Sequence, residues 1–232
     1  MTEMQKMRPS EIKDAIKACY KAGVPPYVQG PPGVGKTAVF HQAAVELGIG
    51  YIPQHVSTME PVDARGIPVQ DEERGTTRWP GPDFLPRIER DGDRGLLHFD
   101  ELVSGVPAVM AALFPAFYPD GQGKRHLGEC EILPGWLPCG SGNRLGDRGV
   151  VYRMPTPLSK RVCFMEMDAH FDDWIAWALD NGVHPKVIAY LRFNTAAFNR
   201  FDPNESVCPD PRSWTQISDF VHQSNPKSLA FH

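Results

Sequence analysis

The sequence predicts an α/β fold, in which a parallel sheet is sandwiched between helices and is followed by a small helical lid. Short apolar strands alternate with helical segments over residues 1–168, which is typical of a parallel sheet covered on both faces. A glycine-rich loop joins an early strand directly to a helix. Residues 169–232 show helical patterns without strands. We therefore expect two domains with a boundary near Ala169.

Capping residues and apolar periodicity predict the first elements. Ser10 is expected to cap a helix that ends at Gly23, because the apolar residues between them share one helical stripe. The next expected elements are a buried strand at 26–29, a helix at 38–47 that Gly48 ends, and a strand at 51–56.

An irregular segment from Glu60 to Ile88 follows, rich in proline, glycine and charge. It is too long for a passive connection and indicates an inserted functional loop. A helix from Pro107 should end at Phe114, because Pro115 cannot continue a helix. The remaining expected elements are strands at 96–101, 137–140 and 161–167, a hairpin at 124–136, and lid helices at 171–179, 185–193 and 213–221.

Residues 30–37 match the phosphate-binding loop (P-loop) pattern, in which four free positions separate a glycine from Gly-Lys-Thr. In the strand–loop–helix setting, backbone N–H groups and the positive helix end surround a β-phosphate. The lysine reaches the β and γ oxygens, and the threonine hydroxyl coordinates Mg²⁺. The alternative is a chance glycine loop with a surface lysine. The residues expected to bind nucleotide are Gly30, Pro31, Pro32, Gly33, Val34, Gly35, Lys36 and Thr37.

Two acidic residues and an asparagine follow strands that should end at the same edge of the sheet. Asp100 is expected to organise Mg²⁺ together with Thr37, and Glu101 to orient and activate a water for attack on the γ-phosphate. Asn143 follows another strand and, as a neutral group, can hydrogen-bond both that water and the γ-phosphate. A solvated strand end and an ordinary turn asparagine give the same local patterns. Together with the loop, these residues predict an ATPase that uses ATP and Mg²⁺.

Composition argues against several other classes of protein. The formal charge of −4 gives no broad basic field, so binding to nucleic acid is not favoured. The five cysteines are scattered, which predicts reduced thiols rather than a disulfide framework. No apolar run approaches the roughly 20 residues of a membrane span, and the first residues lack a signal-peptide pattern. We expect a soluble, cytoplasmic protein without a membrane partner.

These motifs make the chain resemble the AAA+ ATPases and, within them, the MoxR-like group. The resemblance covers nearly the whole chain and includes the P-loop, residues 97–101, Asn143, and the runs 149–155, 157–161 and 211–214. It implies an AAA+ αβα nucleotide-binding core over residues 1–168 and a helical lid over 169–232. It also implies that Arg161 is the arginine finger reaching a neighbouring subunit, and that Arg212 is the sensor 2 arginine touching the phosphate of its own subunit. Arg144, Arg148 and Arg153 remain alternative fingers.

The resemblance further implies ATP-driven remodelling of protein complexes by a hexameric homo-oligomeric ring, with a partner that carries a von Willebrand factor A domain. The segments 60–88 and 124–136 fall where MoxR-like proteins carry extra elements that engage substrates or partners. Lids of the group usually continue with further helices, whereas this sequence stops at 229–232, so a minimal or truncated lid is expected.

Two alternatives stay open at this stage. One is a nucleic-acid-directed motor or loader, whose ATPase activity DNA or RNA would stimulate with steep salt dependence. The other is a small-molecule kinase that uses the same loop, against which the Asp100–Glu101 pair, Asn143 and Arg212 weigh.

Overall fold

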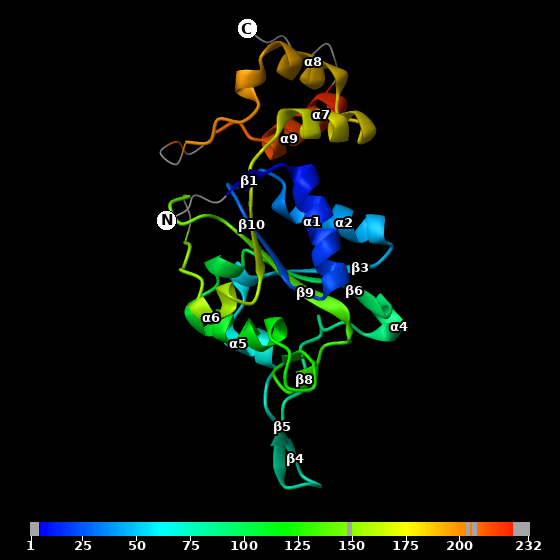
Figure 1. Ribbon diagram of the computed structural model, residues 1–232, viewed down its shortest axis with the longest axis vertical. Coiled ribbons are helices and arrows are strands. Elements are labelled where there is room, and N and C mark those ends of the chain that lie inside the picture. The colour runs from blue at the N-terminus through cyan, green and yellow to red at the C-terminus, as the bar shows by residue number, and fades with distance from the viewer. Residues whose placement is uncertain (1–4, 148–149, 203–204, 206–207, 225–232) are drawn as a thin grey trace.

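The computed structural model describes residues 5–147, 150–202, 205 and 208–224. Its centre is a six-stranded sheet in the order β1-β10-β2-β9-β6-β3 (Figure 1). Every neighbouring pair in this sheet is parallel. The strands are β1 (Lys6–Met7), β2 (Pro26–Gln29), β3 (Gly50–His55), β6 (Arg94–Asp100), β9 (Gly135–Gly142) and β10 (Cys163–Met167).

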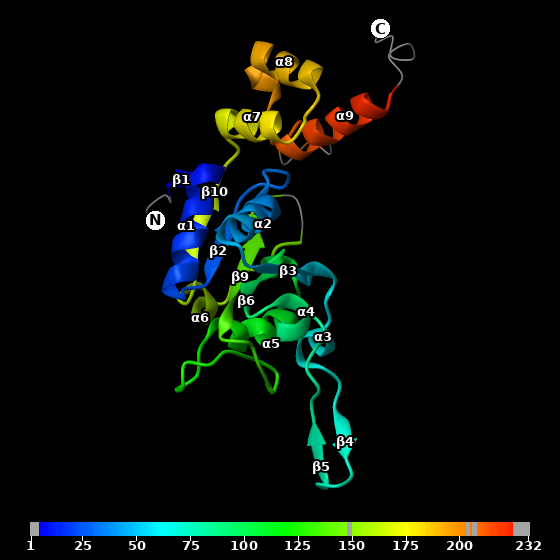
Figure 2. The same ribbon diagram turned by 90° about the vertical axis from the view of Figure 1, so that its right-hand side faces the viewer.

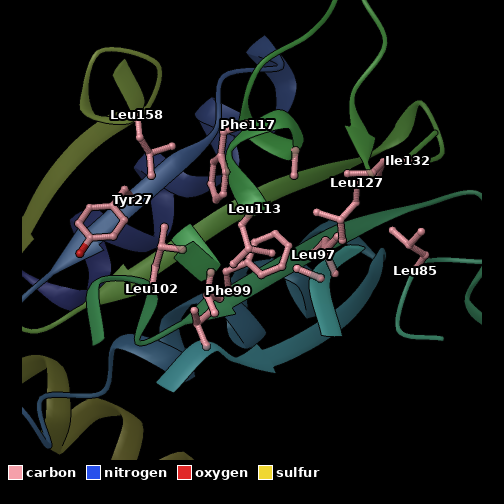
Figure 3. Packing of buried hydrophobic residues seen from close by; sticks show 14 of the residues in the cluster. Tyr27, Leu85, Leu97, Phe99, Leu102, Leu113, Phe117, Leu127, Ile132 and Leu158 are labelled. Atoms are coloured by element: carbon pink, nitrogen blue, oxygen red, sulfur yellow. The ribbon is translucent and has the colours of Figure 1, made fainter. Parts of the chain in front are cut away.

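Helices cover both faces of the sheet, because successive strand residues point to opposite sides. Leu96 packs with Phe40 of α2 in one core cluster, and Leu97 packs with Leu113 of α5 in the other. Figure 3 shows the second cluster, in which side chains from β2, β6 and α5 meet on one face of the sheet. The helices are α1 (Pro9–Ala22) and α2 (Lys36–Leu47) on the first face, and α3 (Pro61–Arg65), α5 (Pro107–Phe117) and α6 (Thr156–Ser159) on the second. The predicted sandwich is confirmed.

A separate group of helices follows the sheet and forms the lid. It consists of α7 (Phe171–Asp180), α8 (Pro185–Phe193), the short η3 (Thr195–Ala197) and α9 (Pro211–Gln223). Trp174, Ile188 and Leu191 are buried in a core of its own, and the indole N–H of Trp214 donates to the carbonyls of Ala197 and Phe198 at 3.0 and 3.1 Å. The lid lies at one end of the molecule in both views (Figures 1 and 2).

Several boundaries differ from those that the sequence predicts, and two of the differences involve a proline. The first helix begins at Pro9, whose fixed φ suits a first turn; Ser10 is therefore not the cap, and its N–H donates to Asp173 of the lid at 2.9 Å. Helix α5 continues through Pro115 to Phe117. Phe117 is 1% exposed, and burying such a side chain contributes about 1.5–3 kcal/mol, which offsets the defect that a proline introduces near a helix end.

The inserted segment is more ordered than its composition suggests. Besides α3 it contains an antiparallel hairpin, β4 (Val69–Asp71) and β5 (Thr76–Arg78). Figure 2 shows this hairpin extending away from the body at the end opposite the lid. The short helix α4 (Ile88–Asp91) then leads into β6. Single 3₁₀ turns follow two strands of the sheet: η1 (Val56–Thr58) follows β3, and η2 (Leu102–Ser104) follows β6.

The predicted hairpin at 124–136 is confirmed in a shorter form, β7 (His126–Leu127) with β8 (Cys130–Glu131). The strand expected at 161–167 begins two residues later, at Cys163, and the strand expected at 96–101 ends at Asp100. Among the described residues, every helix is too short or too polar to span a lipid bilayer.

Candidate nucleotide-binding site

The P-loop turns tightly between β2 and α2. Gly33 and Gly35 have φ values of +78° and +97°, a region that glycine enters without the penalty that a Cβ brings. The N–H of Gly30 donates to the carbonyl of Gly142 at 3.2 Å, which fastens the start of the loop to the end of β9. The first N–H groups of α2 are thus directed into the loop, where they can bind an anion.

Lys36 lies inside the curl of the loop. Its ammonium donates to the carbonyls of Gly30 and Pro31, both at 2.8 Å, and to Oδ1 of Asn143 at 2.9 Å. The side chain is 9% exposed, and this burial lowers the pKa of Lys36 to about 8. A cation removed from water in this way gains strongly from an anionic ligand.

Asp100 ends β6 beside the threonine of the loop. The hydroxyl of Thr37 donates to its Oδ2 at 2.7 Å, while the hydroxyl of Ser141 and the N–H of Glu101 donate to its Oδ1. Burial acts to raise the pKa of the Asp100 carboxyl, but His98 and these hydrogen bonds outweigh it, so the pKa lies below its usual value. His98 is neutral at neutral pH, because burial lowers its pKa to about 4; near pH 7 the hydrogen bonds keep the carboxylate charged.

This pair of oxygen donors fits a magnesium ion. Mg²⁺ prefers oxygen ligands and is usually held by one or two protein groups together with waters and substrate phosphates. The Thr37 hydroxyl and the Asp100 carboxylate already lie within hydrogen-bonding distance of each other, next to the Lys36 curl. Both residues were expected at a magnesium site from the sequence.

Glu101 follows Asp100 in an unusual backbone conformation. Its φ is +54°, and it is the one non-glycine residue with positive φ in the described part of the chain. Such a conformation costs roughly 1–2 kcal/mol and turns the chain sharply at the end of β6. The carboxylate of Glu101 accepts a hydrogen bond from the Ser57 hydroxyl of η1. Glu101 is therefore next to Asp100 in the sequence, but its side chain is oriented by a residue of a different segment.

The two arginines implied by the family resemblance occupy different places. Arg212 is in the first turn of α9, and its charge acts in the same direction as burial in lowering the pKa of Lys36. The residue that caps this helix, Asp210, lies directly against Gly33. Arg161 instead stacks over Tyr118 at 4.2 Å and Phe114 at 5.2 Å from the ring centroids.

The structure therefore brings the lid turn that carries Arg212 toward the phosphate loop. Arg161 is not among the residues that contact Lys36, and its guanidinium also donates to the carbonyl of Pro157 at 2.6 Å. Of the alternative fingers, Arg144 is paired with Asp147 and Glu166 and Arg153 is exposed. Arg148 and Gly149, and the final residues 229–232, lie outside the described part of the chain.

Sequence reasoning missed three polar residues behind the site. Ser141 and His98 are both fully buried, and Tyr51 contacts His98. One signal was available: Ser141 and His98 each stand two residues before a predicted site residue, Asn143 and Asp100, and so project from the same face of their strands in an otherwise apolar setting.

Comparison with solved structures supports the fold. A protein from Cytophaga hutchinsonii described as an ATPase superposes with a TM-score of 0.50 at 12% identity, over 92% of this chain and 58% of that one. NtrX from Brucella abortus superposes with a TM-score of 0.54 at 11% identity, over 97% of this chain and 52% of NtrX. The chain thus spans little more than half the length of either protein. No protein-family model and no curated protein sequence matches it. The chain therefore shares its fold with these two proteins, and in this chain that fold is a parallel sheet sandwiched between helices, followed by a helical lid.

Proposed function

We propose that the chain binds ATP with Mg²⁺ and hydrolyses it to ADP and phosphate. The observation that carries this proposal is the convergence of Lys36, Thr37, Asp100 and Asn143 through direct hydrogen bonds. These residues come from three separated segments, and each supplies a group that phosphoryl transfer requires. The AAA+ fold supports the same assignment.

Each side chain has a distinct role in this proposal. Lys36 exchanges its carbonyl partners for β and γ oxygens, and the loop N–H groups surround the β-phosphate. Thr37 and Asp100 would hold Mg²⁺, which when bound would neutralise the charge that develops on the transferred phosphoryl group. Glu101 orients and activates the attacking water, Asn143 hydrogen-bonds the water and the γ-phosphate, and Arg212 contacts the phosphate from the lid.

The finer proposal is a MoxR-like machine that remodels protein complexes as a homo-oligomeric, hexameric ring. The position of Arg161 supports assembly, because its guanidinium lies outside its own chain's cluster and at the end of α5, where it is available to a neighbouring subunit. The projecting β4–β5 hairpin supports a protein partner or substrate, since an isolated two-stranded hairpin is marginally stable alone. A partner with a von Willebrand factor A domain belongs to the same proposal.

Two variants test the enzymatic proposal. Lys36→Ala should abolish binding of ATP, because it removes the cation inside the loop. Glu101→Gln should bind ATP as the wild type does and lose turnover, because it removes a group that acts on the water alone. Nucleotide affinity and phosphate release are measured for both, without any acceptor substrate. Phosphate release by Glu101→Gln at the wild-type rate would contradict the role assigned to Glu101, and release that needs an acceptor would indicate a kinase.

Two further measurements test the assembly. Light scattering of Glu101→Gln with and without ATP should show a larger mass with ATP, because a nucleotide that contacts two subunits favours the assembled state. DNA and RNA are then added to the wild type at low and high salt. Stimulation that disappears at high salt would favour a nucleic-acid motor instead.

A further inference from the structure

A line of hydrogen-bonded polar groups runs from the partly buried Tyr51 of β3, through two fully buried residues, to Asp100. The hydroxyl of Tyr51 lies 2.8 Å from Nδ1 of His98, and Nε2 of His98 lies 3.0 Å from the hydroxyl oxygen of Ser141. That hydroxyl in turn donates to Oδ1 of Asp100. His98 and Ser141 are both 0% exposed, so neither group exchanges these partners for water.

The geometry assigns a direction to every bond in this chain. A carboxylate accepts, so the Ser141 hydroxyl gives its single proton to Asp100. The Ser141 oxygen must then accept from His98, which places the imidazole proton on Nε2. Nδ1 is left as an acceptor, and the Tyr51 hydroxyl donates to it. The Tyr51 hydroxyl also lies 3.5 Å from the carbonyl oxygen of Thr37, but its single proton goes to the nearer Nδ1 of His98, at 2.8 Å.

The surroundings of His98 indicate that these polar groups are not needed to pack the core. The His98 ring stacks on Phe40 with centroids 4.2 Å apart, and its neighbours on that face of the sheet form an apolar core. An apolar side chain of similar shape fits such a place without the desolvation that a buried polar group requires. Of the groups that these polar residues contact, the Asp100 carboxylate is the one with a role in the proposed function.

We propose that Ser141, oriented by His98 and Tyr51, is a positioning residue that fixes the rotation of the Asp100 carboxylate. With Oδ1 held by the Ser141 hydroxyl and the Glu101 N–H at 3.0 Å, Oδ2 is turned toward Thr37. This inference rests on the proposed function, in which Thr37 and Asp100 hold Mg²⁺. Because Mg²⁺ requires nearly ideal octahedral geometry, a carboxylate free to rotate would bind it less well.

The test measures how Mg²⁺ tightens the binding of a fluorescent ADP analogue, comparing titrations over a range of Mg²⁺ with titrations in EDTA. Ser141→Ala should bind the analogue in EDTA as the wild type does, since the P-loop is untouched. Its half-saturating Mg²⁺ concentration should rise about 10–100-fold, the range found when a group supporting a metal ligand is removed. Ser141→Thr, which keeps a hydroxyl, should restore the wild-type Mg²⁺ dependence.

Cys139→Ala is the matched control. Cys139 lies on the same face of β9 as Ser141 and is equally buried, but its thiol donates to the carbonyl of Leu97 and not to any of these polar groups. It should leave the Mg²⁺ dependence unchanged. Tyr51→Phe removes the hydroxyl that donates to His98 and that also lies 3.5 Å from the carbonyl oxygen of Thr37. It should raise half-saturating Mg²⁺ a few-fold while leaving binding of the analogue in EDTA unchanged, which carries the test if Ser141→Ala does not fold.

The outcomes separate this inference from the proposed function. Wild-type protein that binds the analogue without any Mg²⁺ effect would refute the magnesium site itself, and the inference with it. A Mg²⁺ effect that is present in the wild type and equal in Ser141→Ala and Tyr51→Phe would overturn the inference and leave the proposed function standing.

Discussion

Gly33 lies where the phosphate loop meets the lid, and replacing it with alanine should expose that contact. Its φ is +78°, and a Cβ built there would overlap the carboxylate of Asp210. Asp210 is the N-cap of α9, and its Oδ1 accepts from the N–H of Ser213 at 2.6 Å. Gly33→Ala therefore strains the loop and displaces the group that begins the last lid helix.

The magnitude follows from these two effects. A left-handed backbone costs alanine roughly 1–2 kcal/mol relative to glycine, and loss of an N-cap costs about 1 kcal/mol. Gly33→Ala should lower the free energy of unfolding by about 2–3 kcal/mol, which for a chain of this size is a drop in Tm of roughly 4–12 °C. Gly35→Ala is the control: its φ is +97° but no atom lies within 4 Å of the added Cβ, so it carries backbone strain alone.

A double-mutant cycle in urea separates the contact from the strain. Asp210→Ala alone should cost about 1 kcal/mol. In the Gly33→Ala background it should cost nothing or restore stability, because the overlap is removed and the cap is already displaced. In the Gly35→Ala background the same substitution should add its full cost. If both pairs are additive within about 0.5 kcal/mol, the P-loop and the α9 cap do not touch in solution and the reasoning fails.

Three further outcomes are expected. The pKa of Lys36 is lowered to about 8, and bound phosphate favours the charged form of this side chain, so ADP affinity should fall about tenfold between pH 7 and pH 9. Lys36→Arg should lose this pH dependence, and a wild-type affinity that does not change with pH would contradict the charge assignment. Arg161→Ala should hydrolyse ATP at least about 10³-fold more slowly than the wild type, and should regain turnover when mixed with Lys36→Ala. If the mixture stays inactive although fluorescence transfer shows subunit exchange, Arg161 acts within its own subunit or has a structural role. Trp214→Phe leaves two lid carbonyls without their donor and should cost about 1–3 kcal/mol in urea unfolding; a loss no larger than that of the partly exposed Ile217→Ala would mean that the indole N–H does not hold the lid.

The sequence by itself determined the parts of this protein that depend on local chemistry. The spacing of Gly30, Gly35, Lys36 and Thr37 specifies a tight loop between a strand and a helix, in which Gly35 has the left-handed backbone that precedes the helix. Alternation of short apolar strands with helices determined the parallel sandwich, because neither element can bury its apolar residues alone. The acidic end of β6 and the placement of Asn143 followed from the rule that ligands gather at the carboxyl ends of parallel strands.

Only the tertiary structure decided which residues from distant segments meet. The register of β6 against β9, which pairs His98 with Cys139, brings the imidazole beside Ser141, and the approach of the lid brings Asp210 onto Gly33. Burial of Phe117 carries α5 past Pro115, which propensity alone would forbid. Strand register and the position of the lid depend on the packing of many residues that are far apart in the sequence, and a local hydrophobic pattern does not determine that packing.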